Sequence, residues 1–367
     1  MIDLDFERLR SIGLTPALAQ ALSQTIAQPL PLHGDDAPAP LPARLVQVHR
    51  ETLQLHDGSM ERSARPHPAL LRALAADHDA LAVGDWVLVV ADAQGGLWVT
   101  ARVPPVSHLA RRDGDGHRHA VVSNVDTALL VMGLDLDFNL RRLERYLALV
   151  HGSGLQPVVV LTKSDVAPAA LPAALDSLRG RMPAHIDVLA VDARSPQAAV
   201  ALAPYLAAGQ TLVLLGSSGA GKSTLANTLM GQAVQDTGAV REHDSRGKHT
   251  TTARSLLLLP GGACVIDTPG VRALRPDGDG HSVAAAFEDI ALLAMQCRFR
   301  DCRHEDEPGC AVRAGVPADR LRNYHKLRRE ARRDTLTALE RREEVAKWKV
   351  RHKAAAARMR AKQGGAG

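Results

Sequence analysis

The sequence is poor in cysteine and has no long apolar run. Its 367 residues include four cysteines, too few for a disulfide-rich secreted scaffold, and three of them lie close to one histidine. No apolar stretch reaches the length that spans a membrane, and the start, MIDLDFERLRSIGL, is acidic and amphipathic, unlike a secretory signal. We therefore expect a cytoplasmic protein with no membrane partner.

Aromatic residues are also scarce, at 3%, whereas charged residues are plentiful and unevenly spread. A composition of 46% hydrophobic and 23% charged residues, with a mean hydropathy of −0.10, is typical of a soluble globular protein, and the length suggests roughly two or three domains. The net charge is +5, but residues 320–362 alone hold sixteen Lys or Arg against five Asp or Glu. Such a tail suits a polyanion such as nucleic acid, with a solvated, charge-rich helix as the alternative.

The pattern of the chain changes several times before its middle. Residues 3–27 have a helical rhythm and run into a proline-rich break, QPLPLHGDDAPAPLP. From 43 to 104, short β-like runs separated by Gly and Asp turns predict a small barrel. The basic, glycine-rich stretch over 103–120 predicts a mobile loop that can touch nucleic acid.

From 121 to 270, apolar runs alternate with helical stretches, which predicts a parallel sheet covered by helices. The stretch DFNLRRLERYLALVHGSG places apolar residues on one helical face and ends in glycine. Beyond 275 come a glycine-rich break, the Cys/His cluster and the basic tail. We expect strands at 126–133, 156–162, 186–191, 211–216, 254–259 and 263–267.

A phosphate-binding loop is the strongest single motif. The stretch LVLLGSSGAGKSTL combines an apolar strand, a glycine-rich loop and the start of a helix. Backbone N–H groups of such a loop wrap phosphates, Lys222 would reach the β and γ oxygens, and Ser223 would ligate Mg²⁺. The expected phosphate-site residues are Gly216, Ser217, Ser218, Gly219, Ala220, Gly221, Lys222, Ser223 and Thr224.

A second buried strand, ACVIDTPGV, fits the metal side of the same site. It ends in Asp267, which would hold Mg²⁺ through water, and the Gly270 N–H would meet the γ-phosphate. The polar stretch DSRGKHTTTAR lies between the two motifs, as a loop that senses the γ-phosphate should. One threonine should complete the metal shell, and spacing favours Thr251 over Thr250 or Thr252.

The base-reading element precedes the phosphate loop. In VVVLTKSDV, Asp165 can accept hydrogen bonds from guanine N1 and N2, which adenine does not offer, and the Lys163 stem would cover the ring. The later stretch VLAVDARS would place Ala193 against guanine O6. A P-loop ATPase or small-molecule kinase is the alternative, since a phosphate loop alone does not choose a base. The usual GTPase order starts with the phosphate loop, so the chain has the order of a circular permutation, which leaves a sheet intact.

Hydrolysis needs a group that positions water, and the usual one is missing. Many GTPases carry glutamine after the DxxG glycine, whereas this chain has Val271, which cannot hydrogen-bond a water. Either hydrolysis is slow or another residue acts. His249 is the candidate because a neutral imidazole accepts a proton or hydrogen bond near pH 7, with a surface histidine as the alternative. We expect His249, Lys222 and Thr251 to form the catalytic set.

The Cys/His cluster predicts a metal centre. In MQCRFRDCRHEDEPGCAV, three thiolates and one imidazole make a closed tetrahedral set, which suits structural zinc because no position is left for water. Three unrelated thiols and a histidine are the alternative. The expected ligands are Cys297, Cys302, His304 and Cys310.

Together these residues resemble the circularly permuted ribosome small-subunit-dependent GTPase A family, RsgA. The resemblance covers nearly the whole chain: VGDWV in the barrel, then TKSD, GSSGAGKST, KHTTT and DTPGV, then CxxxxCxHxxxxxC. It implies an α/β fold with an OB-like barrel, a circularly permuted P-loop GTPase domain with helices on both faces of a parallel sheet, and an α-helical zinc-binding domain. We expect a helical extension and linker at 1–42, the barrel at 43–110, the GTPase domain at 120–274, the zinc domain at 275–335 and a basic helical tail at 336–367.

The resemblance also implies an activity and partners. Such proteins hydrolyse GTP to GDP with Mg²⁺, carry zinc, and are stimulated by the small ribosomal subunit, in whose late maturation they act. We expect rRNA contacts through barrel, zinc module and tail, and a monomer. Few aromatics argue against base stacking by the barrel, so phosphate contacts and a steep salt dependence are expected. A nucleotide-gated RNA-binding protein with negligible turnover is a further alternative, given Val271.

The family motif adds Thr162 to Lys163 and Asp165 as a guanine-site residue, and it also points to His249 in hydrolysis. Many GTPases have asparagine at the position of Thr162, where the amide braces the phosphate loop. With threonine at this position, the choice of guanine still depends on Asp165, but the contact that braces the phosphate loop should differ from that of an asparagine.

Overall fold

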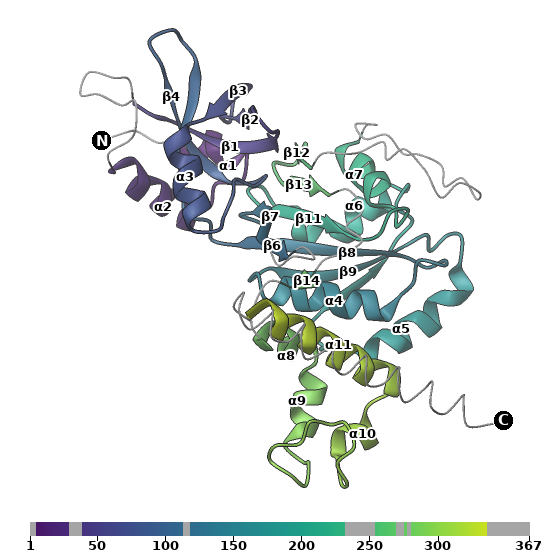
Figure 1. The fold of residues 1–367 in the computed structure, drawn as a ribbon. Coiled ribbons are helices and arrows are strands. Elements are labelled where there is room, and N and C mark those ends of the chain that lie inside the picture. The colour runs from purple at the N-terminus through teal and green to yellow at the C-terminus, as the bar shows by residue number, and fades with distance from the viewer. Residues whose placement is uncertain are drawn as a thin grey trace, which may run out of the picture.

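The computed structural model describes residues 5–28, 39–112, 118–231, 254–268, 275–276 and 280–335. Within these residues the chain forms a small barrel, a central sheet with helices on both faces, a three-stranded sheet beside it and a C-terminal group of helices (Figure 1). No helix among them is long and apolar enough to cross a membrane.

Two short helices precede the barrel and pack on it. The Thr15 side chain accepts a hydrogen bond from the Leu18 N–H and so caps the second helix. Between the helices, Gly13 has a φ of +91°, and a Cβ there would lie 1.9 Å from the Arg44 guanidinium, so the turn requires glycine. The helical rhythm expected over 3–27 is therefore split into α1 (Phe6–Arg10) and α2 (Pro16–Ile26).

Five strands close into the expected barrel, in the order β1-β2-β3-β5-β4. Inward-facing side chains such as Leu45, Leu55 and Val87 form its core. In the stretch VGDWV, a Cβ on Gly84 would lie 2.1 Å from the Ser123 carbonyl, so only glycine allows this close approach to the next sheet. The barrel consists of β1 (Leu41–Val48), β2 (Leu53–His56), β3 (Glu61–Pro66), α3 (Pro68–Ala76), β4 (Trp86–Ala91) and β5 (Leu97–Arg102).

A fully buried arginine joins the barrel to the rest of the molecule. Arg44 lies on β1 and donates to Ile12 O at 2.6 Å, to Asn124 O at 2.7 Å and to Thr211 Oγ1 at 2.9 Å. It thus contacts the N-terminal helices and the central sheet at once. Since a buried guanidinium is tolerated only when its donors are used, this set of partners fixes the barrel relative to the sheet.

The loop expected over 103–120 is partly a strand pair, which corrects that prediction. β6 (His108–Arg112) and β7 (Arg118–Ser123) pair antiparallel, and β14 (Arg275–Pro276) adds to β6. Leu109 and Val122 pair across the two strands and are fully buried in the main core. The charged and glycine residues between them hid these strands in the sequence.

The central sheet has the order β10-β9-β8-β11-β13-β12, with all neighbours parallel except the antiparallel pair β12 and β13. Its strands agree with the expected ranges to within one residue at each end. They are β8 (Thr127–Gly133), β9 (Gln156–Thr162), β10 (Asp187–Ala190), β11 (Thr211–Leu215), β12 (Ser255–Leu258) and β13 (Cys264–Asp267).

Helices cover both faces of this sheet (Figure 1). One apolar core holds Leu147 of α4 and Leu178 of α5, and a second core on the other face holds Leu202 of α6 and Leu225 of α7. The expected α/β fold class is therefore confirmed, with the antiparallel β12 as an addition. The helices are α4 (Leu140–His151), α5 (Leu171–Arg179), α6 (Gln197–Leu202) and α7 (Lys222–Met230), with short 3₁₀ turns at Pro168–Ala170 and Ala203–Tyr205.

The C-terminal helices return to the sheet and pack on α4. Glu144 of α4 is buried and accepts from Arg320 at 2.7 Å and from Asn323, both on α11. Figure 1 shows α11 running beside α4, with α9 and α10 extending away from the sheet. These helices are α8 (Gly280–Ala286), α9 (Glu288–Ala294), α10 (Ala311–Gly315) and α11 (Ala318–Thr335).

Candidate nucleotide site and metal centre

The permuted order brings the base motif and the phosphate motif together. β9, β8 and β11 are parallel neighbours in the sheet, so the loops after them leave at the same edge. The segment after β9 carries the base motif, and the segment after β11 carries the phosphate loop. The two stretches that seemed out of order in the sequence are therefore adjacent in space.

The phosphate loop leaves β11 and enters α7, whose first residue is Lys222. Gly221 has a φ of +93°, the left-handed region that favours glycine. The Lys222 Nζ donates to the carbonyls of Gly216 at 3.0 Å and Ser217 at 2.8 Å, and burial lowers its pKa. Phosphate oxygens can replace these carbonyls as acceptors. Ser218 and Gly219 are exposed at the turn, whereas Thr224 is half-buried on α7.

The metal side of the site is also assembled. The Ser223 Oγ donates to Asp267 Oδ2 at 3.1 Å, across 44 residues of sequence. Asp267 is buried, which raises its pKa, although Lys222 opposes this shift. Its Oδ1 is buried without a hydrogen-bond partner among the described residues. A hydroxyl beside a carboxylate with a free oxygen fits Mg²⁺ directly or through water. His249, Thr251 and Gly270, together with Thr250, Thr252 and Val271, lie outside the described residues.

The base motif contacts the phosphate loop through Thr162. Its hydroxyl lies 2.6 Å from the Ala220 carbonyl, to which it donates, and 3.2 Å from the Met132 carbonyl. Thr162 is fully buried. A threonine hydroxyl thus braces the phosphate loop at the position where many GTPases have asparagine.

The other base-site residues lie at the same edge of the sheet. Lys163 has a φ of +60°, an uncommon conformation for a residue with a side chain, and its Nζ pairs with Asp135 at 2.6 Å. The Asp165 side chain is 30% exposed. The Ala193 carbonyl accepts from Thr228 of α7 at 2.6 Å, which ties the second base element to the phosphate helix.

Sequence reasoning missed the loop after β8. Because β8 lies between β9 and β11, its loop, with the acidic stretch LDLD, sits between the base and phosphate motifs. Asp137 accepts from the Ser217 hydroxyl of the phosphate loop and from Arg142 of α4, while Asp135 holds Lys163. The permuted order was the signal that could have placed these residues, since it defines which strands are neighbours.

The predicted metal ligands converge on one point. The ligand atoms of Cys297, Cys302, His304 and Cys310 all lie within 4.8 Å of one another. His304 Nδ1 is 3.6 Å from Cys297 Sγ and 3.5 Å from Cys310 Sγ, and these two sulfurs are 3.9 Å apart. Tetrahedral zinc with ordinary Zn–S and Zn–N bonds requires about 3.8 Å between sulfurs and about 3.6 Å between sulfur and nitrogen. These three distances fit a tetrahedral zinc ion, and Cys302 Sγ lies within 4.8 Å of the other ligand atoms as the fourth donor.

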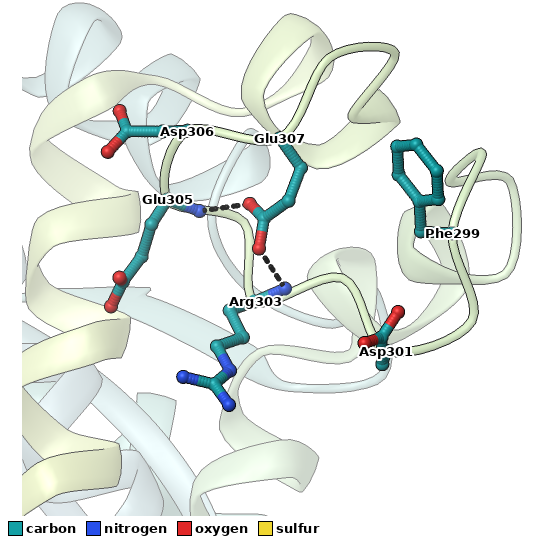
Figure 2. Close-up of a pocket in the computed structure, with 6 residues that line it drawn as sticks. All are labelled: Phe299, Asp301, Arg303, Glu305, Asp306 and Glu307. Carbon is teal, nitrogen blue, oxygen red and sulfur yellow. Dashed lines mark hydrogen bonds between the residues drawn. The ribbon is translucent and has the colours of Figure 1, made fainter.

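A pocket of about 450 Å³ lies beside this centre and has an acidic lining (Figure 2). The Glu307 carboxylate accepts from the backbone N–H groups of Arg303 at 2.8 Å and Glu305 at 2.9 Å, and these bonds lower its pKa to about 2. They stabilise the turn that presents His304. The pocket itself has no role in the nucleotide site, which lies at the sheet edge.

The fold and the phosphate site define a P-loop nucleotide-binding protein of the circularly permuted type. A family model, RsgA GTPase, matches residues 103–276. The small ribosomal subunit biogenesis GTPase RsgA of Xanthomonas campestris pv. campestris (strain B100) is 47% identical over 304 residues, covering 80% of this chain and 81% of that protein. Its counterpart in Xanthomonas axonopodis pv. citri (strain 306) is 48% identical over 305 residues, with the same coverage. The chain therefore belongs to the RsgA GTPase family.

Solved structures support the fold independently. YjeQ from Thermotoga maritima aligns with a TM-score of 0.56 at 22% identity, over 80% of this chain and 98% of that one. YloQ, described as a circularly permuted GTPase, aligns with a TM-score of 0.54 at 21% identity, over 83% of this chain and 99% of that one. At this level of identity the likeness concerns the fold alone.

Proposed function

We propose that this protein is a GTPase that acts on the small ribosomal subunit during its late maturation. One observation carries the guanine-nucleotide part of the proposal: the Thr162 hydroxyl donates to the Ala220 carbonyl and so joins the TKSD stretch to a phosphate loop 58 residues away. A base motif in accidental position would not contact the loop that binds the phosphates of the same nucleotide. Family membership supports the same conclusion.

Each nucleotide-site residue has a role in this proposal. Asp165 accepts from guanine N1 and N2, the Lys163 stem covers the base, and the loop from Gly216 to Thr224 wraps the phosphates. Bound Mg²⁺ would neutralise charge that develops on the phosphates, and Ser223, Asp267 and Thr251 would hold it. The Gly270 N–H would contact the γ-phosphate.

The hydrolytic step needs a residue that orients water, and we propose His249. It stands beside the threonine run, whereas Val271 occupies the position where many GTPases have glutamine. Its neutral imidazole would accept a hydrogen bond from the attacking water. Replacing His249 with Ala should lower turnover at saturating GTP while GTP binding is kept, and an unchanged rate would remove His249 from the mechanism.

We also propose that the Cys/His centre holds one structural zinc ion. Support comes from the distances among Cys297, His304 and Cys310, which agree with tetrahedral zinc, and from Cys302 as a nearby fourth donor, which would leave no position for water. Metal analysis of the purified protein should find one zinc per chain, and Cys302→Ser should lose it. Folding of α9 and α10 without zinc would contradict a structural role.

The small subunit is the proposed partner, because the relatives named above are small ribosomal subunit biogenesis GTPases. Basic residues in the barrel, the zinc module and the tail would contact rRNA phosphates, so binding should weaken steeply with salt. A cytoplasmic monomer fits this role, since each subunit would take one copy.

Guanine choice is tested by binding. GTP and ATP affinities should be compared for the wild type and for Asp165→Asn, which loses the carboxylate that pairs with N1 and N2. We expect the wild type to prefer GTP and the variant to lose that preference. A wild type that prefers ATP would favour a P-loop ATPase or kinase instead.

A second candidate is an RNA-binding switch with negligible turnover, and Val271 is the observation that favours it. Background GTP turnover in the presence of purified small subunits would support this candidate over the GTPase.

A further inference from the structure

The carboxylate that reads guanine lies at the tip of two paired strands. The Ser164 N–H donates to the Val191 carbonyl at 3.4 Å, and the Val191 N–H donates to the Leu161 carbonyl at 2.8 Å. Asp165 follows Ser164, and Asp192 follows Val191. The two carboxylates therefore leave the sheet edge directly beyond its last pairing, one from each strand.

Arg194 connects these two carboxylates. Its Nη2 donates to Asp165 Oδ2 at 2.5 Å, and its Nε donates to Asp192 Oδ1 at 3.3 Å. The backbone N–H of Arg194 also donates to Asp192 Oδ1, at 2.9 Å. The backbone bond orders the Asp192 carboxylate, the Nε bond anchors the guanidinium on it, and the Nη2 end of the guanidinium holds Asp165.

We propose that Arg194 is a positioning residue for guanine recognition: anchored by Asp192, it holds the Asp165 carboxylate in the orientation that pairs with the base. This inference rests on the proposed function, in which Asp165 reads guanine. Guanine N1 and N2 need one lone pair on each carboxylate oxygen. Each oxygen has two, so Oδ2 can keep its bond to Arg194 while the base binds.

Positioning matters here because Asp165 is on an exposed turn. A free aspartate side chain on such a turn samples several rotamers, and binding must then select one of them. A guanidinium with fixed donor directions removes that freedom before the ligand arrives. The effect is on nucleotide affinity and base choice, and the phosphate chemistry at Lys222 is unaffected.

The second base-contacting residue is held in a parallel way. Lys163 pairs with Asp135, which follows β8, just as Asp165 pairs with Arg194, which follows β10. Both contacts come from the loops of the strands that flank β9. The base site is thus organised from both sides by residues outside the TKSD stretch itself.

The opposite effect would follow if Arg194 blocked Asp165 and had to leave before guanine could bind. Such a block would require both lone pairs of Asp165 Oδ2 to be used, whereas Arg194 takes one and leaves the other for the base. The bond that the Arg194 Nε donates to Asp192 Oδ1 also keeps the guanidinium in place. If Arg194 positions Asp165, removing it should weaken guanine-nucleotide binding. If Arg194 blocks Asp165, removing it should strengthen that binding.

The test uses the full-length protein with Arg194→Ala and Arg194→Lys. Affinities for GDP and for a non-hydrolysable GTP analogue are measured by titration, alongside the same analogue of inosine triphosphate, which lacks the guanine 2-amino group. Arg179→Ala is the matched control, because Arg179 forms an exposed pair with Asp176 at 2.8 Å on α5, away from the site. GTP turnover at saturation is measured for all variants.

We expect Arg194→Ala to weaken guanine-nucleotide binding by roughly three- to tenfold, the scale of one ordered side chain. The preference for guanine over hypoxanthine should fall, and turnover at saturation should be unchanged. The affinity of Arg194→Lys should be intermediate, since an ammonium group lacks the planar fork that holds both carboxylates. Arg179→Ala should match the wild type.

Tighter binding by Arg194→Ala would show that the arginine competes with the base, and unchanged binding would show that it has no role. Either result overturns the inference. A wild type without any preference for guanine over adenine nucleotides would instead overturn the proposed function, which separates the two failures.

Discussion

At the residue scale, the most informative position is Thr162. Its hydroxyl donates to the Ala220 carbonyl at 2.6 Å, inside a site where the side chain is fully buried. A hydroxyl offers one hydrogen for donation, whereas an asparagine amide offers two. The brace on the phosphate loop is therefore kept in this chain with a single donor.

Thr162→Ala should weaken GTP binding. The substitution leaves the Ala220 carbonyl without this donor, and a net hydrogen bond contributes about 1 kcal/mol, which corresponds to roughly fivefold in affinity. Thr162→Ser keeps the hydroxyl and should bind nearly as the wild type does. Equal affinities for the Ala and Ser variants, measured by titration with GDP, would show that the hydroxyl does not brace the loop.

A buried aspartate in the barrel gives a prediction on pH. Asp85 is fully buried, and desolvation raises its pKa from 3.8 to about 6, against the opposing charge of Arg102. The folded state therefore binds more protons than the unfolded state between about pH 4 and pH 6. The contribution of Asp85 to the free energy of unfolding falls as pH rises through this window.

Asp85→Asn removes this titration. The free energy of unfolding of the variant, relative to the wild type, should rise by about 2 kcal/mol between pH 4 and pH 7, since each pKa unit corresponds to about 1.4 kcal/mol. Denaturant unfolding followed by tryptophan fluorescence measures this difference. Trp86, the residue after Asp85, is fully buried in the folded state and becomes exposed on unfolding. A difference that does not change with pH would show that Asp85 titrates normally.

At the element scale, α4 links the nucleotide site to the C-terminal helices. Near its start, Arg142 pairs with Asp137, which accepts from the Ser217 hydroxyl of the phosphate loop. Half a turn further, Glu144 binds Arg320, and Arg145 pairs with Glu330 at 2.5 Å. One helix thus contacts the phosphate loop, through Asp137, and also the C-terminal module, by which we mean helices α8 to α11.

Removing the buried contacts of Glu144 with α11 should weaken the packing of the C-terminal helices on α4. Glu144→Ala leaves donors of Arg320 and Asn323 without their acceptor in a buried setting, which should lower the free energy of unfolding by about 3 kcal/mol. Asp176→Ala is the control, because its pair with Arg179 is exposed and should contribute about 1 kcal/mol or less. Similar losses for both variants would mean that the Glu144 pairs do not hold the module.

The sequence predicted the elements of the central sheet closely, because most of their strands are short, mainly apolar runs bounded by polar residues and glycines. It missed β6 and β7, whose short buried runs are flanked by arginines and histidines. The four candidate metal ligands lie close together, as their spacing within 14 residues of chain predicted. The contacts of Arg194, Asp135 and Asp137 join loops of different strands, so spacing along the chain could not reveal them.

At the scale of the whole molecule, the permutation decides what the nucleotide site is attached to. The strand that carries Asp267 is the last of the central sheet in the chain, so the segment after it leads to α8 and the metal centre. α11 then returns to α4, which contacts the phosphate loop through Asp137. The C-terminal module is therefore connected to the nucleotide site by the chain and by packing.

The central claim is that this protein hydrolyses GTP in response to the small ribosomal subunit. The most direct measurement is GTP turnover by the full-length protein with and without purified small subunits, with Lys222→Ala as the inactive control. We predict slow turnover alone, a clear increase with small subunits and no increase with large subunits, and no turnover by the control. Turnover that is unchanged by small subunits, or that is equal with large ones, would contradict the account.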